Sequence, residues 1–71
     1  MDIRQTVGGN IMRERRRRAL SQEALAFAAG VDQAYVSIVE NGAGNLTLSL
    51  IERFANALEV PPDLLLRPPE E

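Results

Sequence analysis

The sequence predicts an all-α domain built from five short helices, and three observations support this prediction. Apolar residues recur at helical spacing, and no segment alternates long enough to indicate a strand. Residues that favour helix ends stand between the apolar segments. The chain has 71 residues, of which 45% are hydrophobic and 25% are charged. These values indicate one domain over residues 1–71, with an ordered core at about 7–66 and a tail over 67–71.

The first helix is expected to begin near Thr6 and to run into a block of arginines. Ile3, Val7 and Ile11 recur four residues apart, which is the spacing of one helix face. A pair of glycines weakens the first turn of this helix.

The second and third helices are delimited by cap and turn residues. Ser21 suits the N-cap of the second helix, and Gly30 suits the left-handed position at its end. Asp32 is expected to cap the third helix, which ends at Asn41-Gly42.

The fourth and fifth helices occupy the C-terminal third of the chain. Thr47 is expected to cap the fourth helix. The core stripe of this helix is expected to comprise Leu48, Ile51, Phe54, Ala55 and Leu58. Two prolines then break the chain, and a short last helix is expected over residues 64–66.

The composition excludes several functions. The chain has no Cys and no His, which removes disulfides, thiolate metal sites and nucleophile–histidine catalysis. We therefore expect no enzyme activity, no cofactor and no metal. The apolar runs are too short to span a membrane, so a cytoplasmic location is expected. A domain this small has a limited core, so self-association is expected to stabilise it.

Charge is unevenly distributed along the chain. The formal net charge is −2, yet residues 1–18 hold six arginines against two acids. No Arg or Lys occurs between Ala19 and Glu52. The dense basic block is therefore more informative about a nucleic-acid partner than the net charge is.

Residues 22–39 match the pattern of a helix–turn–helix at every diagnostic position. Counting from Gln22, the fifth position is the small Ala26 and the ninth is the turn residue Gly30. The fifteenth and eighteenth positions are Val36 and Val39, which would anchor the recognition helix on the core.

These residues resemble the Cro/phage-repressor (Xre-type) DNA-binding family. The resemblance covers residues 7–66 and is carried by the segments LSQEALA (20–26), GVDQAYVS (30–37) and ENG (40–42). It implies a five-helix, lambda-repressor-like fold. Within the family, residues 35–40, 45–48 and 58–60 most resemble the controller proteins of restriction–modification systems, which are stand-alone dimeric regulators.

The resemblance places the third helix in the major groove of double-stranded DNA. Gln33, Ala34 and Ser37 would then contact bases: Gln pairs with adenine, Ala contacts a thymine methyl, and Ser bonds either base. The alternative is that these are solvated helix positions.

Phosphate contacts are expected at the helix ends and in the arginine block. The residues expected to make them are Gln22, Arg13, Arg16, Arg17, Tyr35, Asn45 and Thr47. Capping alone already explains Thr47, and the Tyr35 ring could instead wedge between the third and fourth helices. Consecutive arginines point around the whole helix, so they cannot share one surface.

Two further expectations follow from the resemblance. Arg15 would pair with Glu40 beneath the recognition helix. Leu64, Leu65 and Leu66 would contribute to a homodimer interface with the fourth helix, although Leu64 or Leu65 could instead cap the core.

The leading functional prediction is a homodimeric regulator of transcription that binds a pseudo-palindromic operator, specifically a restriction–modification controller. One alternative is an antitoxin or a phage-type repressor. Another is a protein-interaction module that does not bind DNA tightly. Controller proteins usually carry a basic residue in the recognition helix or the loop after it, where this chain has Gln33 and Gly44, and this departure leaves the last alternative open.

Overall fold

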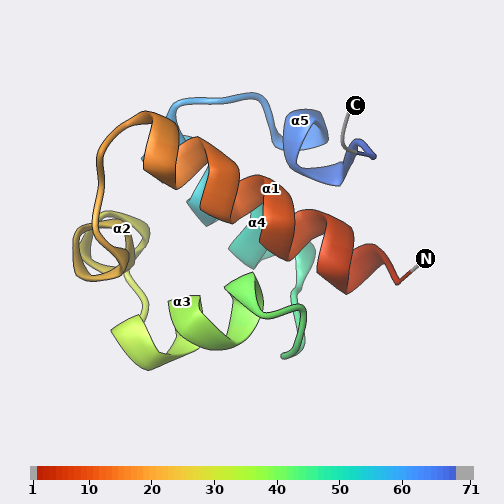
Figure 1. Ribbon diagram of the computed structural model, residues 1–71, viewed down its shortest axis with the longest axis horizontal. Helices are drawn as coiled ribbons and strands as arrows, with labels where there is room; N and C mark the ends of the chain where they lie inside the picture. Colours follow the sequence, from red (N-terminus) through yellow and green to blue (C-terminus); the bar gives the residue numbers. More distant parts are fainter. Residues whose placement is uncertain (1, 69–71) are drawn as a thin grey trace.

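The computed structural model describes residues 2–68 and contains five helices in that range (Figure 1). Helix α1 spans Ile3–Arg17. It begins earlier than the expected start near Thr6, because the Asp2 carboxylate accepts a hydrogen bond from the Arg4 backbone N–H at 2.9 Å and caps the helix. The paired glycines therefore lie inside α1 rather than in its first turn.

Helices α2 (Gln22–Ala29) and α3 (Gln33–Glu40) have the expected boundaries. The Ser21 hydroxyl accepts a hydrogen bond from the Ala24 N–H at 3.0 Å, which confirms the predicted cap. Asp32 occupies the N-cap position of α3, but its side chain makes no capping hydrogen bond. Its backbone carbonyl accepts the first bond of the helix, from the Tyr35 N–H at 3.0 Å.

Helices α4 (Leu48–Leu58) and α5 (Pro62–Leu66) complete the fold. Thr47 caps α4, since its hydroxyl accepts from the Leu50 N–H at 3.1 Å. Helix α5 begins at Pro62, two residues before the expected start, because proline suits the first helical position. Part of the expected tail, residues 69–71, lies outside the described residues.

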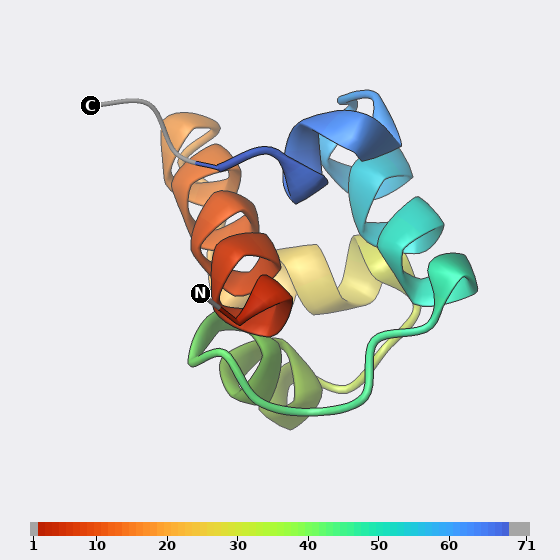
Figure 2. The same cartoon turned by 90° about the vertical axis from the view of Figure 1, so that its right-hand side faces the viewer.

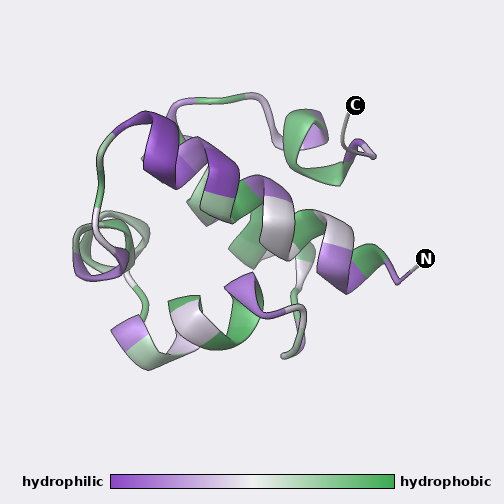
Figure 3. Ribbon diagram, viewed as in Figure 1, coloured by the Kyte–Doolittle hydropathy of each residue, from purple (hydrophilic) through white to green (hydrophobic). Residues whose placement is uncertain are grey.

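The core lies between α1 and the four shorter helices (Figures 1 and 2). Within residues 2–68 the structure has no strand, which confirms the all-α prediction. Figure 3 shows the C-terminal half of α1 as strongly hydrophilic. The buried apolar residues are Val7, Ile11, Leu25, Ala26, Ala29, Val36, Val39, Ile51, Phe54, Ala55, Leu58 and Leu65.

One residue of the predicted core stripe is outside the core. Leu48 is 83% exposed, whereas the other four residues of the α4 stripe are buried. Leu48 is the first residue of α4, and helical side chains tilt toward the N-terminus. Its side chain therefore extends past the end of the packed face.

Helix α1 crosses the C-terminal end of α3 at a glycine. A Cβ atom built on Gly8 would overlap the backbone carbonyl oxygen of Val39, and it would lie 3.2 Å from the carbonyl carbon of the same residue. The two helices therefore approach each other more closely than any side chain on Gly8 would permit. In the described part of the chain, the helices are all too short or too polar to cross a membrane.

Candidate nucleic-acid interface

Helices α2 and α3 are joined by the tight turn that the sequence predicts. Gly30 ends α2 in the left-handed conformation, with φ at 73°. The Val31 N–H then donates back to the Ala26 carbonyl at 3.0 Å, which closes the turn. This turn directs the chain from α2 into α3.

Helix α3 has a buried back and a polar front. Val36 and Val39 are fully buried and fix the helix on the core. Gln33 and Ala34 are exposed on the first turn, and Ser37 is half-buried one turn later. Within residues 2–68, the Gln33 side chain makes no hydrogen bond, so its amide is available to a ligand. The structure thus brings together the three residues expected to contact bases.

The structure contains the ion pair between Arg15 and Glu40. The guanidinium binds both carboxylate oxygens: Arg15 Nε donates to Oε2 at 2.6 Å and Nη2 donates to Oε1 at 3.0 Å. The Glu40 side chain is only 1% exposed. Hydrogen bonding to Glu40 raises the pKa of Arg15, with burial opposing, so this arginine stays charged. Arg15 also donates to the Leu20 carbonyl at 2.8 Å, which fixes the loop before α2.

Gln22 joins this ion pair from the start of α2. Its Nε2 donates to Glu40 Oε1 at 3.1 Å. The set of Arg15, Gln22 and Glu40 therefore ties α1, α2 and α3 together behind the exposed face of α3. The Gln22 amide keeps a second N–H and its carbonyl oxygen, so the bond to Glu40 does not consume the groups that a phosphate contact would need.

The loop between α3 and α4 is anchored by Tyr35. Its hydroxyl donates to the Asn45 backbone carbonyl at 2.8 Å, and its ring is partly buried against the core. The ring thus packs between α3 and the loop before α4. Asn45 and Thr47 are exposed at the end of this loop. To donate to a phosphate, the Tyr35 hydroxyl would have to give up its hydrogen bond to the Asn45 carbonyl.

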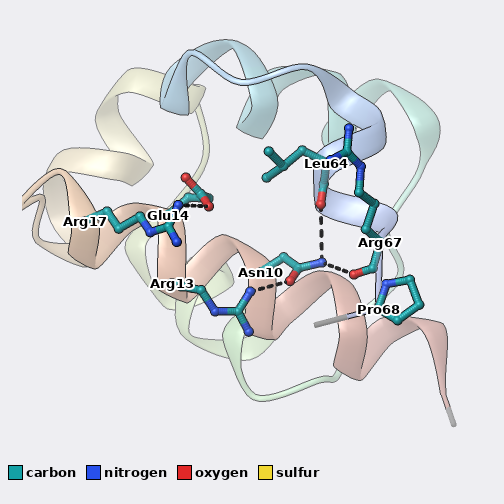
Figure 4. A pocket seen from close by; sticks show the side chains of 7 residues that line it. All are labelled: Asn10, Arg13, Glu14, Arg17, Leu64, Arg67 and Pro68. Carbon is teal, nitrogen blue, oxygen red and sulfur yellow. Dashed lines mark hydrogen bonds and ion pairs between the residues drawn. The ribbon is translucent and has the colours of Figure 1, made fainter. Parts of the chain in front are cut away.

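The arginine block is divided between several surfaces. Arg13 and Arg17 line a hollow beside α5 (Figure 4), so the structure does not bring them together with Gln33. Arg16 is exposed and, within the described range, makes no hydrogen bond or ion pair. Arg18 pairs with Glu14 at 2.8 Å. Arg15 turns toward Glu40, so the five arginines do not all share one face, but Arg13, Arg16 and Arg17 line one further hollow together.

Two buried polar residues of α1 have roles that the sequence analysis did not identify. Asn10 donates through Nδ2 to the carbonyls of Leu65 and Arg67, both at 2.8 Å, and so satisfies the end of α5. Figure 4 shows the bond to Arg67 and a longer one, of 3.5 Å, to the Leu64 carbonyl. Glu14 is 5% exposed and pairs with two arginines one turn later. The available signal was their spacing on the inward side of α1, because Asn10 and Glu14 each follow a core residue, Val7 and Ile11, by three positions.

The three C-terminal leucines have different environments. Leu65 is fully buried within the core, as expected if it caps the core, and it leaves no exposed surface for a second copy. Its side chain packs beneath α5 against core residues of the same chain. Leu64 is partly buried and Leu66 is 39% exposed. Only these two keep apolar surface that a second copy could cover.

Comparisons with known proteins were made for the whole chain. A family model described as "Helix-turn-helix" matches residues 11–65. A hypothetical transcription factor of Neisseria meningitidis serogroup B is 43% identical over 70 residues, which is 99% of this chain and 66% of that protein. The chain therefore spans slightly less than two thirds of that relative.

Two solved structures are similar to this chain over most of its length. The crystal structure of the hypothetical transcription factor NHTF from Neisseria superposes with a TM-score of 0.92 and 43% identity, and covers 96% of this chain and 78% of that one. The restriction-modification controller protein C.AhdI from Aeromonas hydrophila gives a TM-score of 0.84 and 39% identity, with 87% and 94% coverage respectively.

Proposed function

The chain belongs to the helix-turn-helix family, in which its relatives are transcriptional regulators, and from this premise we propose that it binds DNA in a sequence-specific manner. The observation that carries the proposal is the construction of α3. Its back is fixed by two buried valines and by the Arg15–Glu40 pair, while the Gln33 amide faces solvent without a partner in the described range. A recognition helix needs to be held rigidly on the core, and it needs exposed polar groups that are free to bond bases.

Base recognition is assigned to Gln33, Ala34 and Ser37. The phosphate contacts are assigned to groups around α3: Gln22 at the start of α2, and Asn45 and Thr47 at the start of α4. Arg16 on α1, which is exposed and makes no ion pair within residues 2–68, is assigned to the same role.

We propose that the active form is a homodimer. Two copies related by a two-fold axis would place their α3 helices roughly 34 Å apart, one turn of DNA, on a pseudo-palindromic operator. Leu66, exposed on α5, and the half-buried Leu64 supply the apolar contact. The similarity to C.AhdI favours control of a restriction–modification system over an antitoxin or a phage-type repressor.

The test is selection of bound sites from random duplex DNA, followed by titration of the enriched duplex with variants. Gln33→Ala is expected to weaken binding to that duplex by about 1–3 kcal/mol and to relax one base position. Asn56→Ala, which removes an exposed amide from α4, is the matched control and is expected to bind as the parent does. Unchanged site preference in Gln33→Ala would remove this residue from base readout.

A second candidate function is a protein-interaction module, and one observation favours it. Phe27 is 90% exposed on α2, one turn after the exposed Glu23. Such an apolar side chain beside an acid suits a protein partner better than a phosphate backbone does. Failure of the folded chain to enrich any duplex in the selection would favour this function.

A further inference from the structure

A basic hollow lies between α1 and α5, on the opposite side of the molecule from α3. Its volume is about 440 Å³, and three of its lining residues are Arg13, Arg17 and Arg67 (Figure 4). Figures 1 and 2 share a vertical axis, and both place α5 at the top and α3 at the bottom. A duplex lying against the exposed face of α3 would therefore not reach this hollow.

The α1 wall of the hollow holds more positive than negative charge. Arg13 Nη1 donates to the neutral Asn10 amide oxygen at 2.7 Å, and within residues 2–68 it pairs with no carboxylate. Arg17 lies 3.4 Å from a Glu14 oxygen, and that same carboxylate also serves Arg18 at 2.8 Å. One carboxylate is thus shared by two guanidinium groups.

The α5 wall adds a third lining guanidinium. Arg67 pairs with Asp63 at 2.7 Å, and both side chains are largely exposed. Among residues 2–68, Arg13, Arg17 and Arg67 line the hollow with the single carboxylate of Glu14; counting the paired Arg18 and Asp63 as well leaves the same formal excess of two positive charges. Each guanidinium carries five N–H donors, and each uses only one or two of them in the bonds described.

We propose that this hollow binds a small phosphate-bearing anion with two or more negative charges. Phosphate is favoured because planar guanidinium groups bind its oxygens in pairs, and because the uncompensated charge matches a dianion. The volume lies within the range of small-molecule sites. The phosphate belongs to a free small molecule rather than to the DNA backbone, since the hollow faces away from α3.

The position of the hollow gives the ligand a route to regulation, a step that rests on the proposed dimer. Arg13 belongs to α1 and Arg67 directly follows α5, so an anion held by both would draw the two elements together. Asn10 sits between them and already holds the carbonyls at the end of α5. The ligand would therefore fix the orientation of α5, which carries the exposed Leu66.

The test is a titration of isotope-labelled protein with sodium pyrophosphate at constant ionic strength, followed by nuclear magnetic resonance. Saturable shifts are expected for the Asn10 side-chain amide and for the Nε–H groups of Arg13, Arg17 and Arg67. The signal of Arg53, an exposed arginine on α4, is expected not to shift. Equal and unsaturable shifts at Arg53 would overturn the proposal, because they would mean non-specific attraction of anions.

Variants and a second ligand sharpen the result. The double variant Arg13→Gln, Arg17→Gln is expected to weaken pyrophosphate binding by about ten-fold or more, while Arg53→Gln leaves it unchanged. If the double variant is unfolded, Arg67→Gln tests the same site, because Arg67 lies outside the helices and its replacement does not alter α1. Duplex DNA that shifts Arg13 and Arg17 as strongly as pyrophosphate does would assign them to the DNA backbone and overturn the proposal. Pyrophosphate binding without any duplex binding would preserve this site and refute the proposed function.

Discussion

Replacing Gly8 by alanine is expected to destabilise the fold, whereas the same replacement at Gly9 is expected to stabilise it. The two glycines are adjacent in α1 but face different surroundings. An alanine Cβ at Gly8 would overlap the Val39 carbonyl oxygen and lie 3.4 Å from the Glu40 carbonyl carbon. These are backbone atoms, which cannot rotate away as a side chain can. A Cβ at Gly9 would meet nothing within 4 Å.

The magnitude follows from two opposing effects. Alanine favours a helix over glycine by about 1 kcal/mol, and this gain applies at both positions. Overpacking against a rigid neighbour costs about 3 kcal/mol, the upper end of the usual range. Gly9→Ala should therefore raise the free energy of unfolding by up to about 1 kcal/mol, and Gly8→Ala should lower it by about 2 kcal/mol. In a domain of this size that difference corresponds to about 12 °C or more in Tm.

The assay is urea unfolding followed by far-ultraviolet circular dichroism, with all proteins at one concentration. The fixed concentration matters because any self-association adds to the apparent stability. Equal unfolding midpoints for the two variants would refute the close approach of α1 to α3.

Four other changes test separate parts of the structure. Arg15→Ala is expected to lower the free energy of unfolding by about 3–5 kcal/mol, because it leaves a buried carboxylate unpaired, and a loss limited to DNA affinity would contradict this. Leu65→Ala should cost about 2–5 kcal/mol of stability through a core cavity. Leu66→Glu should leave the monomer folded and shift sedimentation toward it; a persistent dimer would exclude Leu66 from the contact. The hydrogen bond from Arg67 holds the pKa of Asp63 below its ordinary value, so the stabilisation from this pair is present at neutral pH and is lost as pH falls through that lowered pKa. Asp63→Asn should abolish the corresponding acid-induced change in α5 amide signals.

Local signals in the sequence were sufficient for the central part of the fold. Ser21, Gly30 and Thr47 each act on backbone groups within a few residues, so their roles can be inferred from adjacent positions alone. The same holds for the small and apolar positions of the helix–turn–helix. The Arg15–Glu40 pair joins residues 25 positions apart, and only the family resemblance indicated it.

The remaining features depend on contacts between distant segments. Asn10 bonds residues more than 50 positions away, and nothing in its own neighbourhood indicates that partner. From the sequence, Gly8 has only an unfavourable effect on helix propensity. In the structure it allows the backbone of α3 at Val39 to pack closely against α1. Leu65 and Leu66 are identical neighbouring residues, and only the way α5 packs on the core decides which of them is buried. The start of α1 was missed although Asp2 offered a capping signal.

The hydrogen bonds from Asn10 to the end of α5 also affect how the chain can fold during synthesis. Leu65, which accepts one of these bonds, is made 55 residues after Asn10. Until residue 65 is available, α1 lacks the partner that covers its α5 side and its buried amide. The helix–turn–helix segment can form its local contacts early, but the core described here can close only once α5 has left the ribosome.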